Sequence, residues 1–385
     1  MAITKNQLFS HALEIIFFAG VLQLHSCKPS PIEPATAREH FSPPGITRIK
    51  DLPDSLKPMF IPVGSIPKLV PIPARVTPSK LSTGDNEPGT TASRGSLYYT
   101  RYTTEQGLAM DAIAGTLCDS RGLLWLGTQG SGVSIFDGRE FRTLYAGNGL
   151  SGNVGSAIFE DRAGRIWLGS HAGLDIYDGR TFRTVTNVPA LQGAVSVIDQ
   201  DSKGRMWLGT PSAGIVRISG SDTTIFDVAE GRRLSRIRKI CEGRSGDMYF
   251  ASMSDLIRID GRDSVSIIHD PAGVPGTEYW CVKTDPSGDV WMGTSAGIAR
   301  VRGEKIQYTS LARDVERKSI INIVADRKGV LWSCTPHGEL FRLENGTWRR
   351  FSPPLEDPGI EVISILFDAQ DDLWFSTQSH GMLKV

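Results

Sequence analysis

Three histidines stand at matching places in a repeated unit of this sequence, and histidine side chains can bind metal ions or act as bases. They are His171, His337 and His380, and each lies one or two residues ahead of a glycine in a short loop. The phase of the repeat predicts that all three lie on one face of the molecule. Exposed loops also tolerate histidine without any function, so a ligand-binding role and an incidental one both remain open.

A second group of residues combines aromatic rings with charge. Tyr279 and Trp280 lie between two repeats, and Arg233 lies in the preceding segment of the same kind. Aromatic faces beside charged groups suit the recognition of a sugar or a peptide, through stacking and directed hydrogen bonds. Trp280 departs from the phase of the other tryptophans, so it either faces a ligand or packs inside its own repeat.

Catalytic spacing is absent from the sequence. It contains no Ser-His-Asp order, no paired carboxylates, no Cys-x-x-Cys and no phosphate loop. The assignment of an enzymatic function would therefore rest on fold analogy alone, and the sequence implies no cofactor. Three charged residues, Asp199, Lys239 and Lys283, lie in the first strand expected in their repeats. They are candidates to face a central channel and hold water or a small ligand.

A repeat of about forty residues sets the elements that position these side chains. Six tryptophans and one tyrosine recur 40 to 42 residues apart: Trp125, Trp167, Trp207, Tyr249, Trp291, Trp332 and Trp374. Most copies have an aspartate six residues earlier and a glycine three residues earlier, as in Asp201 and Gly204. An aspartate can bond nearby backbone N–H groups, and glycine tolerates the positive φ of a hairpin turn. Each unit is expected to form four short strands.

Four strands in about forty residues make one blade of a β-propeller. Seven units therefore predict an all-β, seven-bladed propeller of four-stranded antiparallel blades over residues 94–385. The seventh unit ends after its third strand, at Val385, whereas an unassigned strand, Leu97–Tyr102, precedes the first unit. We expect this N-terminal strand to complete the last blade and close the ring, which removes exposed sheet edges. A row of separate hairpin domains is the competing prediction.

Charge gives no indication of nucleic acid or of an anionic membrane surface as a partner, because 42 basic residues balance 42 acidic ones. Four cysteines lie inside the repeats: Cys118, Cys241, Cys281 and Cys334. They show no metal-ligand spacing and are expected to be buried thiols. The first strands predicted for adjacent blades carry Cys241 and Cys281, so a disulfide between them is an open alternative.

The first 27 residues have the features of an export signal: Lys5 near the start, then an apolar stretch over residues 15–22. The segment ends in Leu24, Ser26 and Cys27, which resembles a bacterial lipoprotein cleavage box. The resemblance makes Cys27 the lipidated N-terminus of an exported protein in the periplasm, the outer membrane or the cell surface. An ordinary cleaved signal and an uncleaved anchor are the alternatives. Any contact with a membrane would be through this lipid.

Residues 28–93 carry 13 of the 22 prolines. Proline excludes helix and interior strand, so a largely extended tether is expected between the lipid and the propeller. Short apolar pieces such as Phe60–Val63 can still lie against the propeller.

The Asp-x-x-Gly-x-x-Trp-x-Gly-Thr unit resembles the two-component regulator propeller repeat. The resemblance covers about three quarters of the chain, and it is most specific around Trp125, Trp167, Trp207 and Trp291. It implies the ligand-sensing propeller of bacterial hybrid histidine kinases, here without a kinase. More loosely, the repeat is similar to the seven-bladed streptogramin lyases, which use a metal ion and a histidine at the channel mouth.

Three functions follow as hypotheses. The first is a non-catalytic propeller that binds a small ligand such as an oligosaccharide, or an envelope protein. The second is a metal-dependent, lyase-like enzyme that uses His337 or His380. The third is a scaffold for protein assembly.

Overall fold

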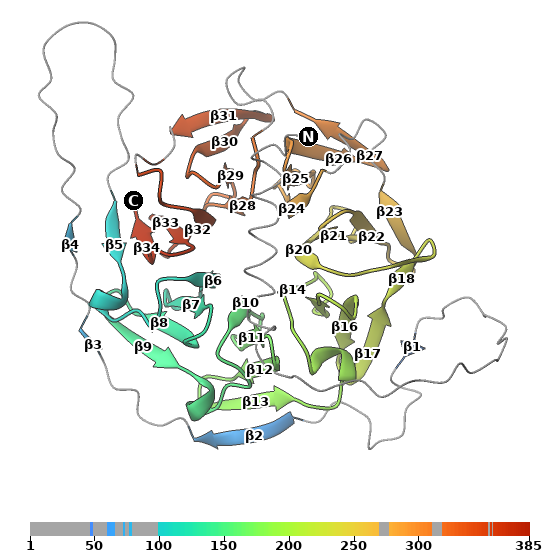
Figure 1. Ribbon diagram of the computed structural model, residues 1–385. Helices are drawn as coiled ribbons and strands as arrows, with labels where there is room; N and C mark the ends of the chain where they lie inside the picture. The colour runs from blue at the N-terminus through green and yellow to red at the C-terminus, as the bar shows by residue number, and fades with distance from the viewer. Residues whose placement is uncertain are drawn as a thin grey trace, which may run out of the picture. The chain divides into compact units, whose positions relative to one another are not determined.

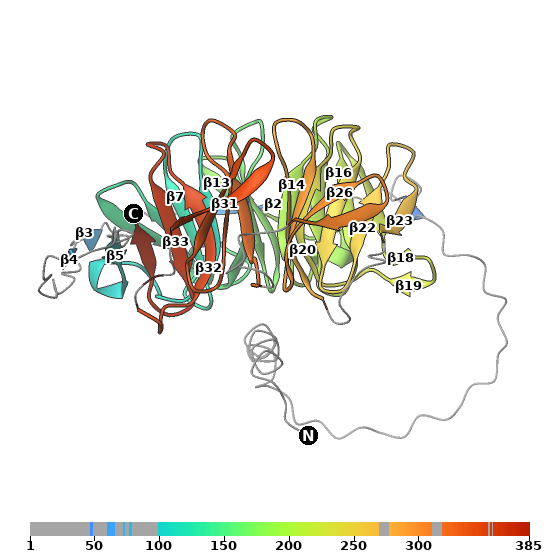
Figure 2. The same cartoon turned by 90° about the horizontal axis from the view of Figure 1, so that it is seen from above.

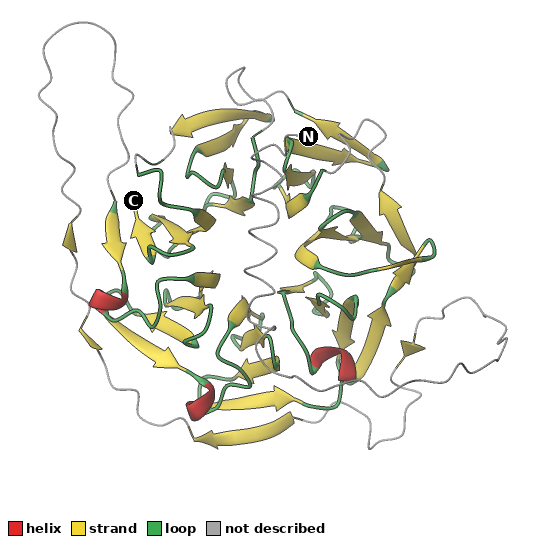
Figure 3. Cartoon of the chain, viewed as in Figure 1, coloured by secondary structure: helices red, strands yellow, loops and turns green. Residues whose placement is uncertain are grey.

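The computed structural model describes residues 99–268, 277–309, 318–352, 355 and 357–385, and four short strands between residues 47 and 78. Residues 1–27, with Cys27, and most of residues 28–93 lie outside the described residues. The repeats form seven antiparallel sheets around a central axis (Figure 1). The fold is therefore the predicted seven-bladed β-propeller, and strands and loops make up almost all of it (Figure 3).

In each blade the first strand lies nearest the centre, and the next three follow outward in chain order. Blade 1 consists of β6 (Ile113–Cys118), β7 (Leu124–Thr128), β8 (Val133–Phe136) and β9 (Glu140–Leu144). Blade 2 consists of β10 (Gly155–Glu160), β11 (Ile166–Ser170), β12 (Gly173–Tyr177) and β13 (Thr181–Val185). Blade 3 consists of β14 (Val197–Gln200), β15 (Met206–Gly209), β16 (Ile215–Ser219) and β17 (Asp222–Phe226).

Blades 4 to 6 have the same order. Blade 4 consists of β20 (Ile237–Glu242), β21 (Met248–Ser252), β22 (Leu256–Ile259) and β23 (Val265–Ile268). Blade 5 consists of β24 (Tyr279–Thr284), β25 (Val290–Thr294), β26 (Gly297–Arg302) and β27 (Lys305–Tyr308). Blade 6 consists of β28 (Asn322–Ala325), β29 (Leu331–Cys334), β30 (Leu340–Glu344) and β31 (Thr347–Ser352).

Blade 7 is closed by a strand from the other end of the propeller sequence. It contains β32 (Val362–Phe367), β33 (Leu373–Thr377) and β34 (Met382–Lys384), and its fourth strand is β5 (Thr100–Tyr102). Register pairs Met382 with Tyr102 and Lys384 with Thr100. The prediction that an N-terminal strand completes the last blade is confirmed.

The segment before β5 adds a fifth strand to four blades. Strands β1 (Thr47–Arg48), β2 (Phe60–Ser65), β3 (Ile72–Pro73) and β4 (Thr77–Pro78) pair with the outer strands of blades 3, 2, 1 and 7, in that order. Figure 1 shows β2 alongside β13 at the rim. The expected four-stranded blade is thus extended by an edge strand, the position in a sheet where proline is tolerated.

Among the described residues, the links between blades contain few regular elements. Three 3₁₀ turns, η3 (Thr104–Gln106), η4 (Ala146–Asn148) and η5 (Pro189–Leu191), lie in the links between blades 7 and 1, 1 and 2, and 2 and 3. A two-stranded hairpin, β18 (Val228–Ala229) and β19 (Arg232–Arg233), lies between blades 3 and 4. None of the helices among the described residues has the length and hydropathy of a membrane span.

The repeated aromatic ring of each blade packs on the next blade. Trp207 lies in one apolar cluster with Phe250 and Ile257 of blade 4, and Trp374 of blade 7 lies in a cluster with Leu126 of blade 1. The glycine two residues after the ring allows this approach, since a Cβ on Gly209 would come within 2.6 Å of the Cβ of Ile237. The apolar contacts therefore continue around the whole ring.

The turn between first and second strands has the predicted chemistry and one feature beyond it. Asp201 accepts the backbone N–H groups of Lys203 and Arg205 through one carboxylate oxygen, at 3.0 and 2.9 Å. Its other oxygen accepts the indole N–H of Trp207 at 2.8 Å. Gly204 has φ +81° at this turn. The sequence predicts the turn, but the bond to the buried ring appears only in the structure.

Candidate functional site

The first strands β6, β10, β14, β20, β24, β28 and β32 surround the centre and contact one another in a closed cycle (Figure 1). Their N-terminal ends lie on the face that carries the blade links and the loops between second and third strands, here called the loop face. The backbone N–H of Val195, ahead of β14, donates to the carbonyl of Ser170 at the end of β11, at 3.0 Å. Figure 2 shows the blades from the side, with their strands running between the two faces.

Five first strands carry a β-bulge near the loop face, where one residue has no partner on the second strand. The bulged residues are Ala114, Ser156, Arg238, Trp280 and Ile363. A bulge redirects a side chain out of the regular alternation of the strand. Arg238 and Trp280 are the largest side chains at these positions, and both are partly exposed.

Serines at this position in blades 2 and 3 make ordinary structural contacts. The hydroxyl of Ser156 donates to the carbonyl of Val195 at 2.9 Å, and that of Ser196, at the matching place in blade 3, donates to the carbonyl of Ile237. Each bond joins a blade to the next one. Blades 4 and 5 have a charged and an aromatic side chain here instead.

Arg238 and Trp280 form a stacked pair across the boundary of blades 4 and 5. The guanidinium carbon of Arg238 lies 4.0 Å from the centroid of the Trp280 ring, and its Nη1 lies 3.3 Å from a carboxylate oxygen of Glu278. Trp280 is partly exposed, yet its Nε1 is buried and has no hydrogen-bond acceptor among the described residues. An unpaired N–H costs free energy unless a ligand or water accepts it.

Deeper in the channel, three charged side chains come from blades 3, 4 and 5. Asp199 lies opposite Trp207 in the register, and Lys283 lies opposite Trp291. Lys239 lies opposite Ala251, one residue after the bulge of β20. Both lysines are exposed and Asp199 is half-buried. Among the described residues, neither ammonium group has a hydrogen bond or an ion pair.

The electrostatics of these groups are coupled. Burial raises the pKa of Asp199 to about 6, against the opposing effect of Lys283 and Lys239. Burial lowers the pKa of Lys239, and the nearby charge of Lys283 lowers it further. The side chain of Lys239 is exposed to water although burial lowers its pKa. Both are expected in a water-filled channel, where protein surrounds the ammonium group and water still reaches it.

The cysteines beside this channel are structural. All four cysteines within the described residues are free, and Cys241, Cys281 and Cys334 are buried. Burial raises the pKa of the Cys241 and Cys281 thiols to about 12. Such thiols stay protonated and are poor nucleophiles.

The loop histidines occupy the expected loops, in blades 2, 6 and 7. His171 and His337 are exposed. His380 lies with Nδ1 3.0 Å from the hydroxyl of Ser379, and its backbone N–H donates to Thr377 at 2.8 Å. His337 lies near Glu361, whose pKa is raised by burial and lowered in part by this histidine. No group of three or more His, Cys, Asp or Glu within the described parts of the chain could hold a metal ion.

The remaining predicted site residues differ in exposure. Tyr279 is 6% exposed and packs in the apolar cluster between blades 4 and 5. Arg233 is exposed on β19, in the hairpin between blades 3 and 4. Sequence analysis missed Arg238, although the repeat carries a signal for it: Arg238 and Trp280 are 42 residues apart, one repeat length. They therefore hold the same place in neighbouring blades.

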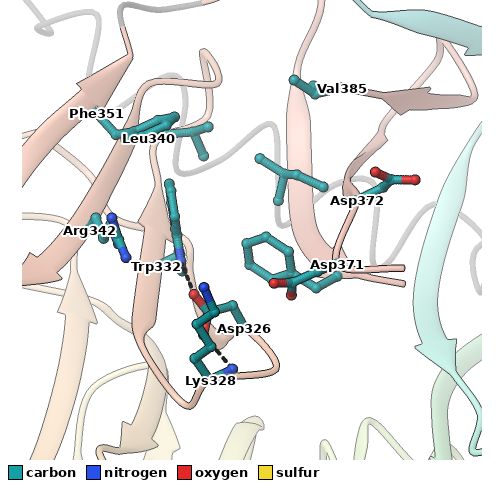
Figure 4. Close-up of a pocket in the computed structure, with 11 residues that line it drawn as sticks. Asp326, Lys328, Trp332, Leu340, Arg342, Phe351, Asp371, Asp372 and Val385 are labelled. Carbon is teal, nitrogen blue, oxygen red and sulfur yellow. Dashed lines mark hydrogen bonds between the residues drawn. The ribbon is translucent and has the colours of Figure 1, made fainter. Parts of the chain in front are cut away.

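A groove of about 350 Å³ lies between blades 6 and 7, away from the channel (Figure 4). Phe351 is 57% exposed there and lies edge-on to Trp332, with ring centroids 4.6 Å apart. Two carboxylates of this groove are already engaged: Asp326 accepts the Trp332 indole N–H at 3.0 Å, and Asp372 pairs with Lys384 at 2.7 Å. The channel, with its unpaired groups, is the stronger candidate for a ligand site.

The geometry defines a class, a seven-bladed propeller with a charged channel. Residues 148–172 match the family model described as two component regulator propeller, which confirms the resemblance of the repeat. No curated protein matches the sequence. The match covers part of one repeat, the part that contains Asp161, Gly164 and Trp167.

Solved structures extend the likeness to the whole ring. The extracellular domain of a putative hybrid two-component system from B. thetaiotaomicron is 20% identical with a TM-score of 0.62, covering 74% of this chain and 41% of that domain. Virginiamycin B lyase from Staphylococcus aureus is 16% identical with a TM-score of 0.59, covering 72% and 96%.

PorZ, a surface component of the type-IX secretion system of Porphyromonas gingivalis, is 18% identical with a TM-score of 0.54. The alignment covers 71% of this chain and 46% of PorZ. Identities this low show the fold alone. The protein thus has the propeller fold of these extracellular and surface proteins.

Proposed function

We propose that this protein is an exported, non-catalytic propeller that binds a carbohydrate ligand at the channel mouth on the loop face. We include in the proposal a lipid anchor at Cys27 and a location in the periplasm, the outer membrane or the cell surface. Binding at the mouth uses the side chains that the bulges of blades 4 and 5 present there.

The observation that carries the proposal is the Arg238–Trp280 pair. The indole N–H of Trp280 is buried without an acceptor, and Arg238 stacks on its ring at 4.0 Å. A sugar offers C–H faces that pack on the partly exposed ring of Trp280, and a small shift of the ring would let a hydroxyl oxygen accept from this N–H, which is buried in the free protein. Serine fills the same place in blades 2 and 3 and is bonded to the next blade, so the pair is a departure from the structural pattern.

Calorimetry on the full-length protein in detergent, after a screen on an oligosaccharide array, tests the proposal. Trp280→Ala is expected to weaken binding by at least tenfold, since stacking and the hydrogen bond are both lost. Trp280→Phe keeps a ring and loses only the N–H, so its effect should be smaller. Trp348 on the outer strand β31 also has a buried, unpaired Nε1, and Trp348→Phe is the matched control with unchanged affinity.

Two results bear against the carbohydrate site. If no oligosaccharide binds, a carbohydrate ligand is ruled out. An envelope protein captured by the same face would then be the ligand. Equal effects of Trp280→Phe and Trp348→Phe would remove the channel mouth as the site. Export and anchoring have their own test: Cys27→Ser should abolish labelling by a radioactive fatty acid and release the protein from the membrane fraction.

A further inference from the structure

We propose that Lys239 and Lys283 bind an oxyanion, a carboxylate or a phosphate carried by the ligand, inside the central channel. This inference rests on the proposed function, because it names the chemistry of the ligand that enters at the loop face. It assigns a site below the Arg238–Trp280 pair, on the same two blades.

Register places the two lysines on the channel wall. They lie on β20 and β24, the innermost strands of adjacent blades, and these two strands contact each other. Both side chains are exposed although the strands that carry them are central. The exposed surface of an innermost strand is the channel itself, so the ammonium groups lie where a ligand in the channel would meet them.

The two charges lack the partners that would make them structural. Within the described chain neither lysine has an ion pair or a hydrogen bond. Burial and the charge of Lys283 lower the pKa of Lys239, against the opposing effects of Cys281 and Asp199. An anion between the two ammonium groups would stabilise both charges. The arrangement is costly without a ligand and favourable with one.

The nearby carboxylates do not take this place. Glu242 is committed to the preceding blade, where it accepts the backbone N–H of Ser202 at 2.7 Å and also bonds the Ser202 hydroxyl. Asp199 lies within electrostatic reach of both lysines and accepts the backbone N–H of Gln200 at 2.8 Å, but it forms no ion pair with either lysine among the described residues. Among the described residues, neither carboxylate therefore neutralises the lysines through an ion pair.

The charge is confined to one sector of the channel. At the register position opposite the repeated aromatic ring, blades 3 and 5 have Asp199 and Lys283. The other blades have uncharged residues at that position: Leu117, Phe159, Cys241, Val324 and Leu366. A one-sided cluster orients a ligand, with its anionic group towards blades 4 and 5 and its uncharged part towards the apolar wall.

Calorimetry with four probes on the full-length protein tests the inference. The probes are a trisaccharide of galacturonic acid, the neutral maltotriose, succinate and inorganic phosphate. We expect the acidic trisaccharide to bind at least tenfold more tightly than maltotriose. Competition of succinate or phosphate with the acidic trisaccharide shows which oxyanion the site binds when no sugar is attached to it.

Variants locate the effect. Lys239→Met and Lys283→Met keep most of the side-chain length and remove the charge, and each should weaken binding of the anionic probes by about tenfold. Lys239→Arg should restore much of the affinity. Lys305→Met, the same substitution at an exposed position of the outer strand β27, should change nothing. Unfolding temperatures of the variants show whether they are folded.

The outcomes separate this inference from the proposed function. If maltotriose and the acidic trisaccharide bind equally, or if the double lysine variant binds anions as the wild type does, the oxyanion site is wrong and sugar binding stands. If no anionic probe binds, the oxyanion site is also wrong. If anions bind through the lysines and Trp280→Ala has no effect on any probe, the oxyanion site stands and the sugar site at the mouth is wrong.

Discussion

The carboxylate of Asp201 bonds both the turn that contains it and the buried indole ring of Trp207, so it connects this turn to the core of the propeller. The indole Nε1 of Trp207 donates to Asp201 at 2.8 Å, and both side chains are buried. The same bond occurs in six blades, at 2.8 to 3.0 Å. Blade 4 has Gly243 and Tyr249 at the two positions, so donor and acceptor are replaced together. This pairing explains why the aspartate and the tryptophan recur as a unit.

The first prediction concerns the coupling of this pair. Asp201→Ala should lower the free energy of unfolding by about 3 kcal/mol, because the indole N–H and two backbone N–H groups lose their acceptor. Trp207→Phe removes only the donor and some contact area. A double-mutant cycle by urea denaturation should give a coupling energy of about 1 to 2 kcal/mol. Strictly additive losses would show that the bond contributes nothing beyond each side chain alone.

The second prediction is a loss of stability in acid. Burial raises the pKa of Asp201, but hydrogen bonds from Trp207 and Arg205 outweigh it and leave the pKa below its usual value of 3.8. Asp119 and Asp161 are lowered in the same way. A carboxyl with a depressed pKa stabilises the fold above 3.8, and this contribution is lost as the pH falls below 3.8. Unfolding temperature should therefore drop steeply below about pH 4, and less steeply in Asp201→Ala.

The third prediction concerns ring closure. Tyr102 on β5 is 7% exposed, and its ring lies 5.1 Å from that of Trp374 and 5.2 Å from that of Phe136 in blade 1. Tyr102→Ala should lower the free energy of unfolding by about 3 to 4 kcal/mol, as expected for a buried aromatic ring. Tyr145→Ala is the control, since this side chain is 50% exposed. Similar losses in both variants would mean that β5 does not hold the ring closed.

The repeat predicted the fold well because its signals are local. The turn residues Asp201 and Gly204 and the ring of Trp207 act within one unit, so each unit can be interpreted without its neighbours. The period then counts the blades and places the strand before the first unit in the last blade. The fifth strands β1 to β4 were not predicted, because β pairing at an edge depends mainly on the backbone and leaves little pattern in the sequence.

The candidate site was only partly predictable. Trp280 was noticed because it departs from the phase of the other tryptophans, and Lys239 and Lys283 because they are charged within expected strands. The Arg238–Trp280 stack depends on two bulges and on the contact between two blades. Neither property follows from residue type, and only the spacing of 42 residues connects the two positions.

The fourth prediction separates binding from lyase-like chemistry. A lyase-like site would use His337 or His380 with a divalent metal, in the adjacent blades 6 and 7. Under the proposed function, full-length protein dialysed against zinc or magnesium should retain no stoichiometric metal, and His337→Ala should leave ligand affinity within about twofold, the effect usual for an exposed side chain. Metal analysis and calorimetry check this. One bound metal per chain that disappears in His337→Ala would favour the enzyme.

The fifth prediction follows from Asp199, whose pKa is raised to about 6 by burial. Lys283 and Lys239 on the facing strands oppose this shift, and Glu242 adds to it. Above pH 6 the ionised Asp199 competes with an incoming anion for the two lysines. Below pH 6 it becomes neutral, so anion affinity should rise about fivefold between pH 7.5 and pH 5, a modest change for charges in contact with water.

The trisaccharide of galacturonic acid is the probe for this measurement, because its carboxylates stay ionised over this range, whereas phosphate and succinate change charge. Asp199→Asn should bind as tightly at pH 7.5 as the wild type does at pH 5, with little further change on acidification. Asp222→Asn, on the exposed edge of β17, is the control and should keep the wild-type profile. A profile in Asp199→Asn as steep as in the wild type would mean that Asp199 is not the titrating group.

Stability gives a second and independent readout of the same group. A carboxyl whose folded pKa lies above 3.8 disfavours the fold when it is ionised, so Asp199 costs stability above about pH 6 and none below 3.8. Asp199→Asn should therefore unfold at a higher temperature than the wild type at pH 7.5, and the difference should shrink as the pH falls towards 4. Because this measurement needs no ligand, it tests the charge balance of the channel even where the ligand chemistry is different.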